Sequence, residues 1–122
     1  MPFTFKNLTV YQKSLDVVQD VETLSKNLKG QVSFSLMDQL SRASLSVPLN
    51  IAEGNGRWHK REKQQFLRIA QGSVFEMVPV IQVMHRRGLI EKSYYDSMYE
   101  RLERLAKMLT SLIKSVDDLM RD

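Results

Sequence analysis

Cysteine is absent from this chain of 122 residues, and histidine occurs only twice. Without cysteine the protein cannot form disulfides, thiolate nucleophiles or cysteine-ligated zinc and iron sites, and the composition is compatible with a reducing cytoplasm. His59 and His85 lie far apart in the sequence. We therefore expect no metal site shared by the two histidines and no cofactor.

Glycine and proline are also scarce, with five and three residues, while 43% of the chain is hydrophobic and 26% is charged. This composition is typical of a globular domain rich in helix formers and not of a disordered tail. No apolar run approaches the roughly 18 residues of a membrane-spanning helix, and residues 1–6 lack the basic start and apolar core of a signal peptide. We expect one cytoplasmic domain over residues 1–122, without a membrane partner.

Four helices are predicted, because apolar residues recur every three or four positions. The first row contains Leu8, Tyr11, Leu15, Val18, Val21, Leu24 and Leu28. The second contains Leu36, Met37, Leu40, Ala43, Val47 and Ile51. The third, in a helix from about Lys60 to Arg87, contains Phe66, Ile69, Ala70, Ser73, Met77, Val80 and Met84. The fourth contains Tyr95, Met98, Leu102, Leu105, Leu109, Leu112, Val116 and Leu119.

The connections between these helices are short, which favours an all-α fold, an antiparallel up-down-up-down four-helix bundle. We expect Asn7 to cap the start of the first helix and Gly30 to end it in a left-handed conformation. The second helix is expected to begin near Ser33 or Ser35, where Ser35–Asp38 approximates a capping box. Gly54 lies close to its end.

A polar stripe follows the second helix. At 100° per residue its members fall within an arc of about 80°, separate from the core row: Arg42, Ser46, Asn50, Glu53 and Arg57. We expect an ion pair between Arg42 and Glu53, and a kink where Pro48 interrupts the helix, with a similar kink at Pro79. Glu53 as a catalytic acid or base is the enzymatic alternative. No nucleophile, metal-ligand spacing or phosphate-binding glycine loop accompanies it, so we predict that the protein is not an enzyme.

Further apolar residues lie outside the core rows. These second rows contain Leu45, Leu49 and Ala52 on the second helix and Leu67, Val74, Val78 and Ile81 on the third. A helix of a lone bundle needs one apolar face, so we expect the second rows to contact another subunit. The predicted structural or interface residues are Arg42, Leu45, Ser46, Pro48, Leu49, Asn50 and Glu53. Whether the stripe lies inside one subunit or between two is open.

Four separated segments carry a resemblance to a known family: Leu8–Gln12, Arg42–Arg57, Phe66–Ser73 with Glu76, and Arg87–Ile90. Over nearly its whole length the chain resembles the four-helix-bundle proteins encoded in 23S ribosomal RNA intervening sequences. The resemblance implies assembly into a ring of five. Relatives of that family are basic accessory proteins of the reverse transcriptases of diversity-generating retroelements, and they are thought to bind nucleic acid as well as the transcriptase.

The positive charge of the chain, formally +4, is concentrated in residues 57–68, and the other acidic and basic residues balance. The residues predicted to bind nucleic acid are Arg57, Trp58, Lys60, Arg61, Lys63 and Arg68. Cations contact phosphates, and the Trp58 indole is suited to stack on an unpaired base. The alternative is a solvated loop with Trp58 packed against a neighbour.

The sequence thus predicts a non-enzymatic homopentamer with a basic face that binds nucleic acid, RNA in the first place. The alternative is a protein-binding assembly scaffold, or a reverse-transcriptase accessory protein, without a direct nucleic-acid role. Neither function requires a metal or a cofactor.

Overall fold

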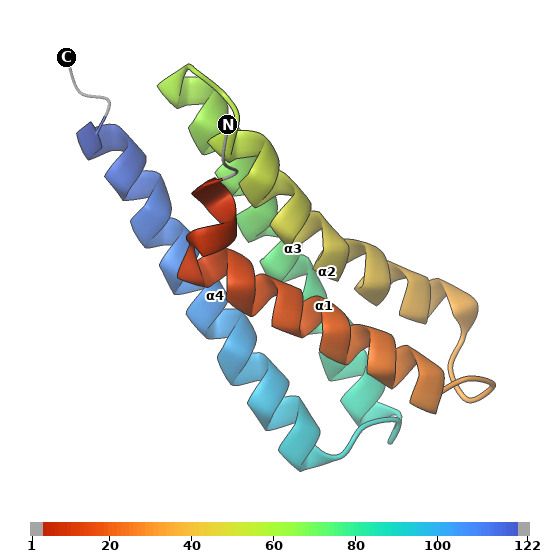
Figure 1. Ribbon diagram of the computed structural model, residues 1–122. Helices are drawn as coiled ribbons and strands as arrows, with labels where there is room; N and C mark the ends of the chain where they lie inside the picture. Colours follow the sequence, from red (N-terminus) through yellow and green to blue (C-terminus); the bar gives the residue numbers. More distant parts are fainter. Residues whose placement is uncertain (1–3, 120–122) are drawn as a thin grey trace.

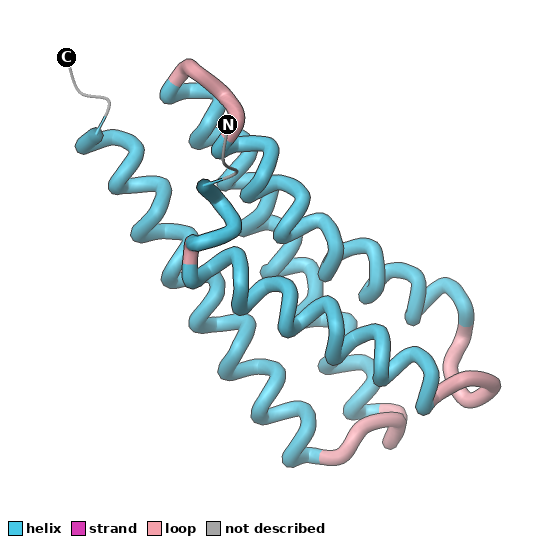
Figure 2. Tube along the Cα trace, viewed as in Figure 1, coloured by secondary structure: helices cyan, strands magenta, loops and turns pink. Residues whose placement is uncertain are grey.

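The computed structural model describes residues 4–119, apart from the side chains of residues 6, 7 and 117–119. The chain forms a short 3₁₀-helix, η1 (Thr4–Asn7), and then α1 (Thr9–Asn27), α2 (Phe34–Asn55), α3 (Lys60–Arg86) and α4 (Lys92–Leu119). The four α-helices lie side by side, each antiparallel to the next along the chain (Figure 1). Short loops join them (Figure 2). The predicted antiparallel four-helix bundle is confirmed over the described residues.

The core row of α4 is confirmed. Its buried members are Met98, Leu102, Leu105, Leu109 and Val116. Tyr95 and Leu112, from the same predicted row, are half-buried. The side chain of Leu119 lies outside the described residues.

The predicted core row of α1 is wrong in its first half. Val10, Ser14 and Val17 are buried, whereas Leu15 is 37% exposed and Val18 is half-buried. Ser14 can enter the core because its hydroxyl donates a hydrogen bond to the Tyr11 carbonyl at 2.6 Å, which satisfies the polar group without water. The buried row of α1 contains Ser14, a polar residue. A prediction based on apolar residues alone therefore chose Leu15, one position further along, as the buried residue.

The third helix also differs from the prediction. Leu67, Val74 and Ile81, assigned above to a subunit contact, are buried in the core of the single chain, and Ile69 is 45% exposed. The reason is that α3 is a central helix: it packs on α2 along one side and on α4 along the other. A helix between two neighbours needs two apolar rows, so the second row on α3 gives no evidence of another subunit.

The helix ends are partly as predicted. Gly30 has a φ of 84°, the left-handed conformation expected of it. Leu8, not Asn7, occupies the N-cap position of α1, because the chain passes through η1 before α1 begins. At α2 the cap is Ser33, whose hydroxyl accepts a hydrogen bond from the Leu36 amide at 3.3 Å, and Ser35 lies inside the helix.

Each of the two prolines is contained in a single helix. Pro48 is buried within α2 and Pro79 is exposed within α3. Neither proline therefore ends its helix, although each removes a backbone donor.

The contact between α1 and α4 contains a partly exposed ion pair and a buried hydroxyl. Arg101 of α4 forms an ion pair with Asp20 of α1. The nearby Tyr94 hydroxyl is buried without a hydrogen-bond partner among the described residues. Burial raises the pKa of Tyr94, and the charge of Asp20 adds to this effect. The hydroxyl therefore remains protonated at neutral pH.

The two helices α2 and α3 approach closely at Gly54. A Cβ atom on Gly54 would lie 3.1 Å from the Lys63 carbonyl oxygen and 3.2 Å from the Phe66 Cβ. Both neighbours belong to, or are bonded to, the α3 backbone and cannot swing away as the end of a long side chain would. The missing side chain of Gly54 thus allows the two helices to meet at this distance.

Substitution of Gly54 by alanine should therefore destabilise the protein, by about 1–2 kcal/mol, because the added methyl group overpacks the contact by more than the helix gains. Gly72→Ala is the matched control, since a Cβ at Gly72 in α3 meets nothing within 4 Å. It should stabilise by about 1 kcal/mol, as expected for alanine in an exposed helix interior. Urea unfolding gives the free energy of unfolding of both variants. Equal changes in this free energy would contradict the close contact at Gly54.

Candidate nucleic-acid interface

The basic segment predicted from the sequence forms the corner between α2 and α3. Residues 56–59 connect Asn55, the last residue of α2, to Lys60, the first of α3. Figure 2 shows this loop at the end of the bundle where η1 also lies. The Asn55 side-chain amide donates to the Thr4 hydroxyl at 3.1 Å, so η1 helps to fix the corner.

Two of the predicted binding cations are engaged in holding this corner. The Arg57 guanidinium donates to the Glu53 carboxylate at 2.9 Å and lies 4.7 Å from the centre of the Phe66 ring. The Lys63 ammonium donates to the Asn55 carbonyl at 3.1 Å, where the negative end of the α2 dipole favours a cation. Arg57 and Lys63 therefore have structural roles, whatever else they contact.

Trp58, Arg61 and Arg68 are the predicted residues that point outward. Trp58 is 89% exposed, so within one chain it does not pack against a neighbour. Arg61 and Arg68 are exposed and lie seven residues apart, on one side of α3. Lys60, at the first position of α3, is half-buried. The corner thus presents an aromatic ring beside cations that are available to phosphates.

The residues of the polar stripe on α2, all of which the structure describes, form short-range contacts and no continuous network along the helix. Arg42 lies 3.8 Å from Asp38 and Glu53 binds Arg57, so the predicted pair of Arg42 with Glu53 is wrong. Eleven residues separate these two positions, which is about 16 Å along a helix and too far for an ion pair. Residues four positions away along the helix supply the partners instead.

The centre of the stripe is satisfied inside the chain. The Asn50 amide donates to the Ser46 carbonyl at 2.8 Å and to its hydroxyl at 3.0 Å. The Ser73 hydroxyl of α3 donates to the Ser46 hydroxyl at 2.8 Å. This part of the stripe therefore joins α2 to α3 within one subunit.

The second row on α2 is accessible in the single chain. Leu45 is 49% exposed and Leu49 is 55% exposed, whereas Ala52 is half-buried and Pro48 is buried. Exposed leucines on one helix face are the feature expected of a contact with another protein.

Phe75 is 61% exposed on α3, and no role was predicted for it from the sequence. The spacing could have indicated its position, because Phe75 follows Arg68 by seven residues and so continues the side of α3 that contains Arg61 and Arg68.

Two negative observations apply to the described residues. No three histidine or acidic side chains among them are grouped as a metal site requires. In residues 4–119, no helix combines the length and the apolar character needed to span a membrane.

The helix order and packing define a class, the small all-α proteins built as a single antiparallel four-helix bundle. Within it, the model of the family described as 23S rRNA-intervening sequence protein matches residues 6–111. The chain belongs to this family, which confirms the resemblance drawn from the four sequence segments.

A solved structure supports the same conclusion. It is that of a protein of unknown function from the S23 ribosomal protein family of Bacteroides thetaiotaomicron VPI-5482. It shares 26% sequence identity with this chain at a TM-score of 0.82, covering 87% of this chain and 99% of the other. A comparison with curated proteins finds no match.

The different environments of Lys63 and Arg61 lead to a prediction about stability. Lys63→Gln should lower the free energy of unfolding by about 0.5–1 kcal/mol, because it removes a cation from the end of α2. Arg61→Gln, two residues earlier, removes the same charge from an exposed position and should change it little. Thermal and urea unfolding at low ionic strength compare the stabilities of the two variants. An equal loss of unfolding free energy in both would show that Lys63 does not cap α2.

Proposed function

We propose that this protein is a non-enzymatic, homo-oligomeric bundle that binds nucleic acid, RNA in the first place, at the corner between α2 and α3. The observation that carries this proposal is the 89% exposure of Trp58 within a basic segment. An indole in water adds nothing to the stability of the chain, whereas it gains by stacking on an unpaired base. The cations of the same segment provide the attraction to phosphates.

The start of α3 adds a further group of donors. His59 occupies the N-cap position but its side chain makes no capping hydrogen bond. His59 itself therefore supplies no side-chain acceptor to the start of α3, and the N-terminus of a helix favours an anion. Glu62 in the first turn opposes this attraction, so the arginines must supply most of it.

The family to which the chain belongs is compatible with this ligand. Its description, 23S rRNA-intervening sequence protein, names an intervening sequence of ribosomal RNA. The description does not state an activity, and the proposal therefore rests on the corner itself.

The test uses the double variant Trp58→Ala/Arg61→Gln, because neither side chain supports the fold. Its affinity for labelled single-stranded RNA should fall at least tenfold, since base stacking contributes about 1–3 kcal/mol. The dependence of log K on log salt should become shallower by about 0.7, the value for one lost phosphate contact on a single strand. Fluorescence anisotropy over a salt series measures both quantities.

Phe34→Ala/Arg104→Gln provides the matched control. Phe34 is 84% exposed at the start of α2, at the other end of that helix from the corner, and the Arg104 side chain of α4 is 55% exposed. This variant loses the same residue classes and should bind RNA as the wild type does. Equal affinities of the corner variant and the wild type would refute the proposed site.

For the assembly, we propose a homopentameric ring in which the exposed leucines of α2 contact the next subunit. Support comes from the exposure of Leu45 and Leu49 and from the ring that the family resemblance implies. A ring with an odd number of subunits needs a heterologous contact, so this row meets a different face of its neighbour. Five copies of the corner would then multiply the attraction for a polyanion.

Charged substitutions test this contact. Leu45→Lys/Leu49→Lys should reduce the mass in solution to that of one chain, 14.2 kDa, because two ammonium groups cannot be buried in an apolar interface. Leu15→Lys, on the 37% exposed leucine of α1, is the control and should leave the assembly intact. Light scattering coupled to size exclusion gives the masses, and a wild-type monomer at micromolar concentration would rule out the ring.

The second candidate function is a protein-binding scaffold, or an accessory protein of a reverse transcriptase, without direct binding of nucleic acid. The same exposed leucines favour it, because a partner protein could cover them as well as a second copy. An intact assembly that shows no affinity for RNA would select this candidate.

A further inference from the structure

One exposed side of α3 carries cations at both ends and apolar residues in the middle. At 100° per residue, its members fall within an arc of about 40°. They are Arg61, Arg68, Phe75, Pro79 and Arg86, and all five are exposed. We call this set the α3 track.

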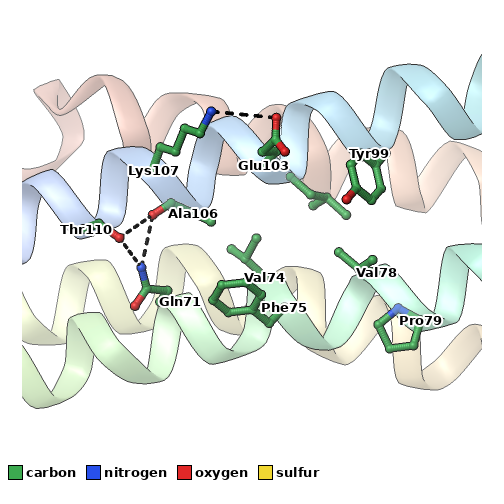
Figure 3. Close-up of a pocket in the computed structure, with 11 residues that line it drawn as sticks. Gln71, Val74, Phe75, Val78, Pro79, Tyr99, Glu103, Ala106, Lys107 and Thr110 are labelled. Carbon is green, nitrogen blue, oxygen red and sulfur yellow. Dashed lines mark hydrogen bonds and ion pairs between the residues drawn. The ribbon is translucent and has the colours of Figure 1, made fainter.

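The track borders a groove between α3 and α4 with a volume of about 440 Å³. Figure 3 shows Phe75 on the α3 side and Tyr99 on the α4 side of this groove. Tyr99 is 41% exposed and Phe75 is 61% exposed, so both rings are accessible. Polar groups at one edge are already paired, since the Gln71 amide donates to the Thr110 hydroxyl at 2.6 Å and to the Ala106 carbonyl at 3.1 Å.

Aromatic rings continue from the groove toward the end of α3. Tyr99 lies 6.0 Å from Tyr95, and Tyr95 is stacked on His85 at 4.9 Å with 16° between the ring planes. Tyr95 and His85 border a second hollow of about 450 Å³ that Gln82 and Arg86 also line. An aromatic surface therefore extends from the middle of the bundle to Arg86.

The charges around this surface are mainly positive. Glu103 of α4 borders the groove, but Lys107 lies 3.8 Å from it and balances it. Glu76 of α3 faces the other way, since it binds Gln39 of α2. The net positive charge of the track therefore comes from Arg61, Arg68 and Arg86. An acidic ligand with apolar faces fits this combination.

We propose that the α3 track and the adjoining groove bind a single-stranded polynucleotide, with phosphates on Arg68 and Arg86 and unpaired bases against Phe75 and Tyr99. This inference rests on the proposed function, because it extends the corner site along the same helix. A duplex would not use the rings, since its bases are stacked inside. From Arg61 to Arg86 the helix rise amounts to about 38 Å, the length of about eleven stacked nucleotides.

The experiment compares labelled oligouridylates of about 4 and about 16 nucleotides, lengths that span the range of known single-strand sites. Trp58 is the only tryptophan of the chain, so quenching of its fluorescence reports occupation of the corner. Anisotropy of the label reports total affinity. The wild type should bind the long oligouridylate much more tightly than the short one.

Two variants act on the track away from the corner. Arg86→Gln should weaken binding of the long oligouridylate several-fold and make its salt dependence shallower by about 0.7, the loss of one phosphate contact. Phe75→Ser should weaken it by about tenfold through lost stacking. Quenching of Trp58 by the short oligouridylate should be unchanged in both. Arg104→Gln, which removes one exposed arginine from another part of α4, is the matched control and should bind both lengths normally.

The outcomes separate the two proposals. Wild-type affinity of both track variants for the long oligouridylate would overturn this inference and leave the corner site standing. Absence of any binding by the wild type would overturn both. A fall in the mass of the assembly on Phe75→Ser would show that the groove holds a second copy of the chain, which also overturns the inference.

Discussion

The close contact of α2 with α3 at Gly54 determines the geometry of the proposed binding corner. Because no side chain separates the backbones there, α3 begins directly beside the end of α2, within reach of the Lys63 ammonium. Arg57 is held in the same place by Glu53 and the Phe66 ring. With these interactions filling the inside of the corner, Trp58 and Arg61 are left on its outside. The exposure of the proposed ligand-binding groups is thus a consequence of how tightly the helices meet.

The position of α3 between α2 and α4 has a second consequence. Its two buried rows leave one exposed side, and that side contains both Arg61 and Arg86. The residues of the α3 track lie on one line of this side, along a helix of 27 residues. A flexible polymer with regularly spaced charges can follow a line of this kind, whereas a compact globular ligand would contact only part of it.

The sequence predicted the number, order and approximate limits of the helices, because an apolar residue every three or four positions is a strong signal over many turns. It did not predict which face of α1 is buried, since Ser14 enters the core by bonding to its own helix backbone. It also assigned Leu67 and Val74 to another subunit, because spacing cannot tell a helix with two neighbours from a helix at an interface. For the site, charge and the tryptophan located the corner, but only coordinates separate Lys63, which caps α2, from Arg61, which is exposed.

The surface proposed for assembly and the surface proposed for ligand binding lie on different parts of the chain. The Ser46 and Ser73 hydroxyls join α2 to α3 on the polar side of α2, with the exposed leucines of α2 next to that stripe. The groove with Phe75 lies on the opposite edge of α3, against α4. A subunit that covers Leu45 and Leu49 of one chain does not by that contact cover Phe75 and Tyr99 of the same chain. The proposed ring therefore requires that the other face of the heterologous contact lies outside the groove; every subunit then repeats the nucleic-acid face, with avidity along one strand.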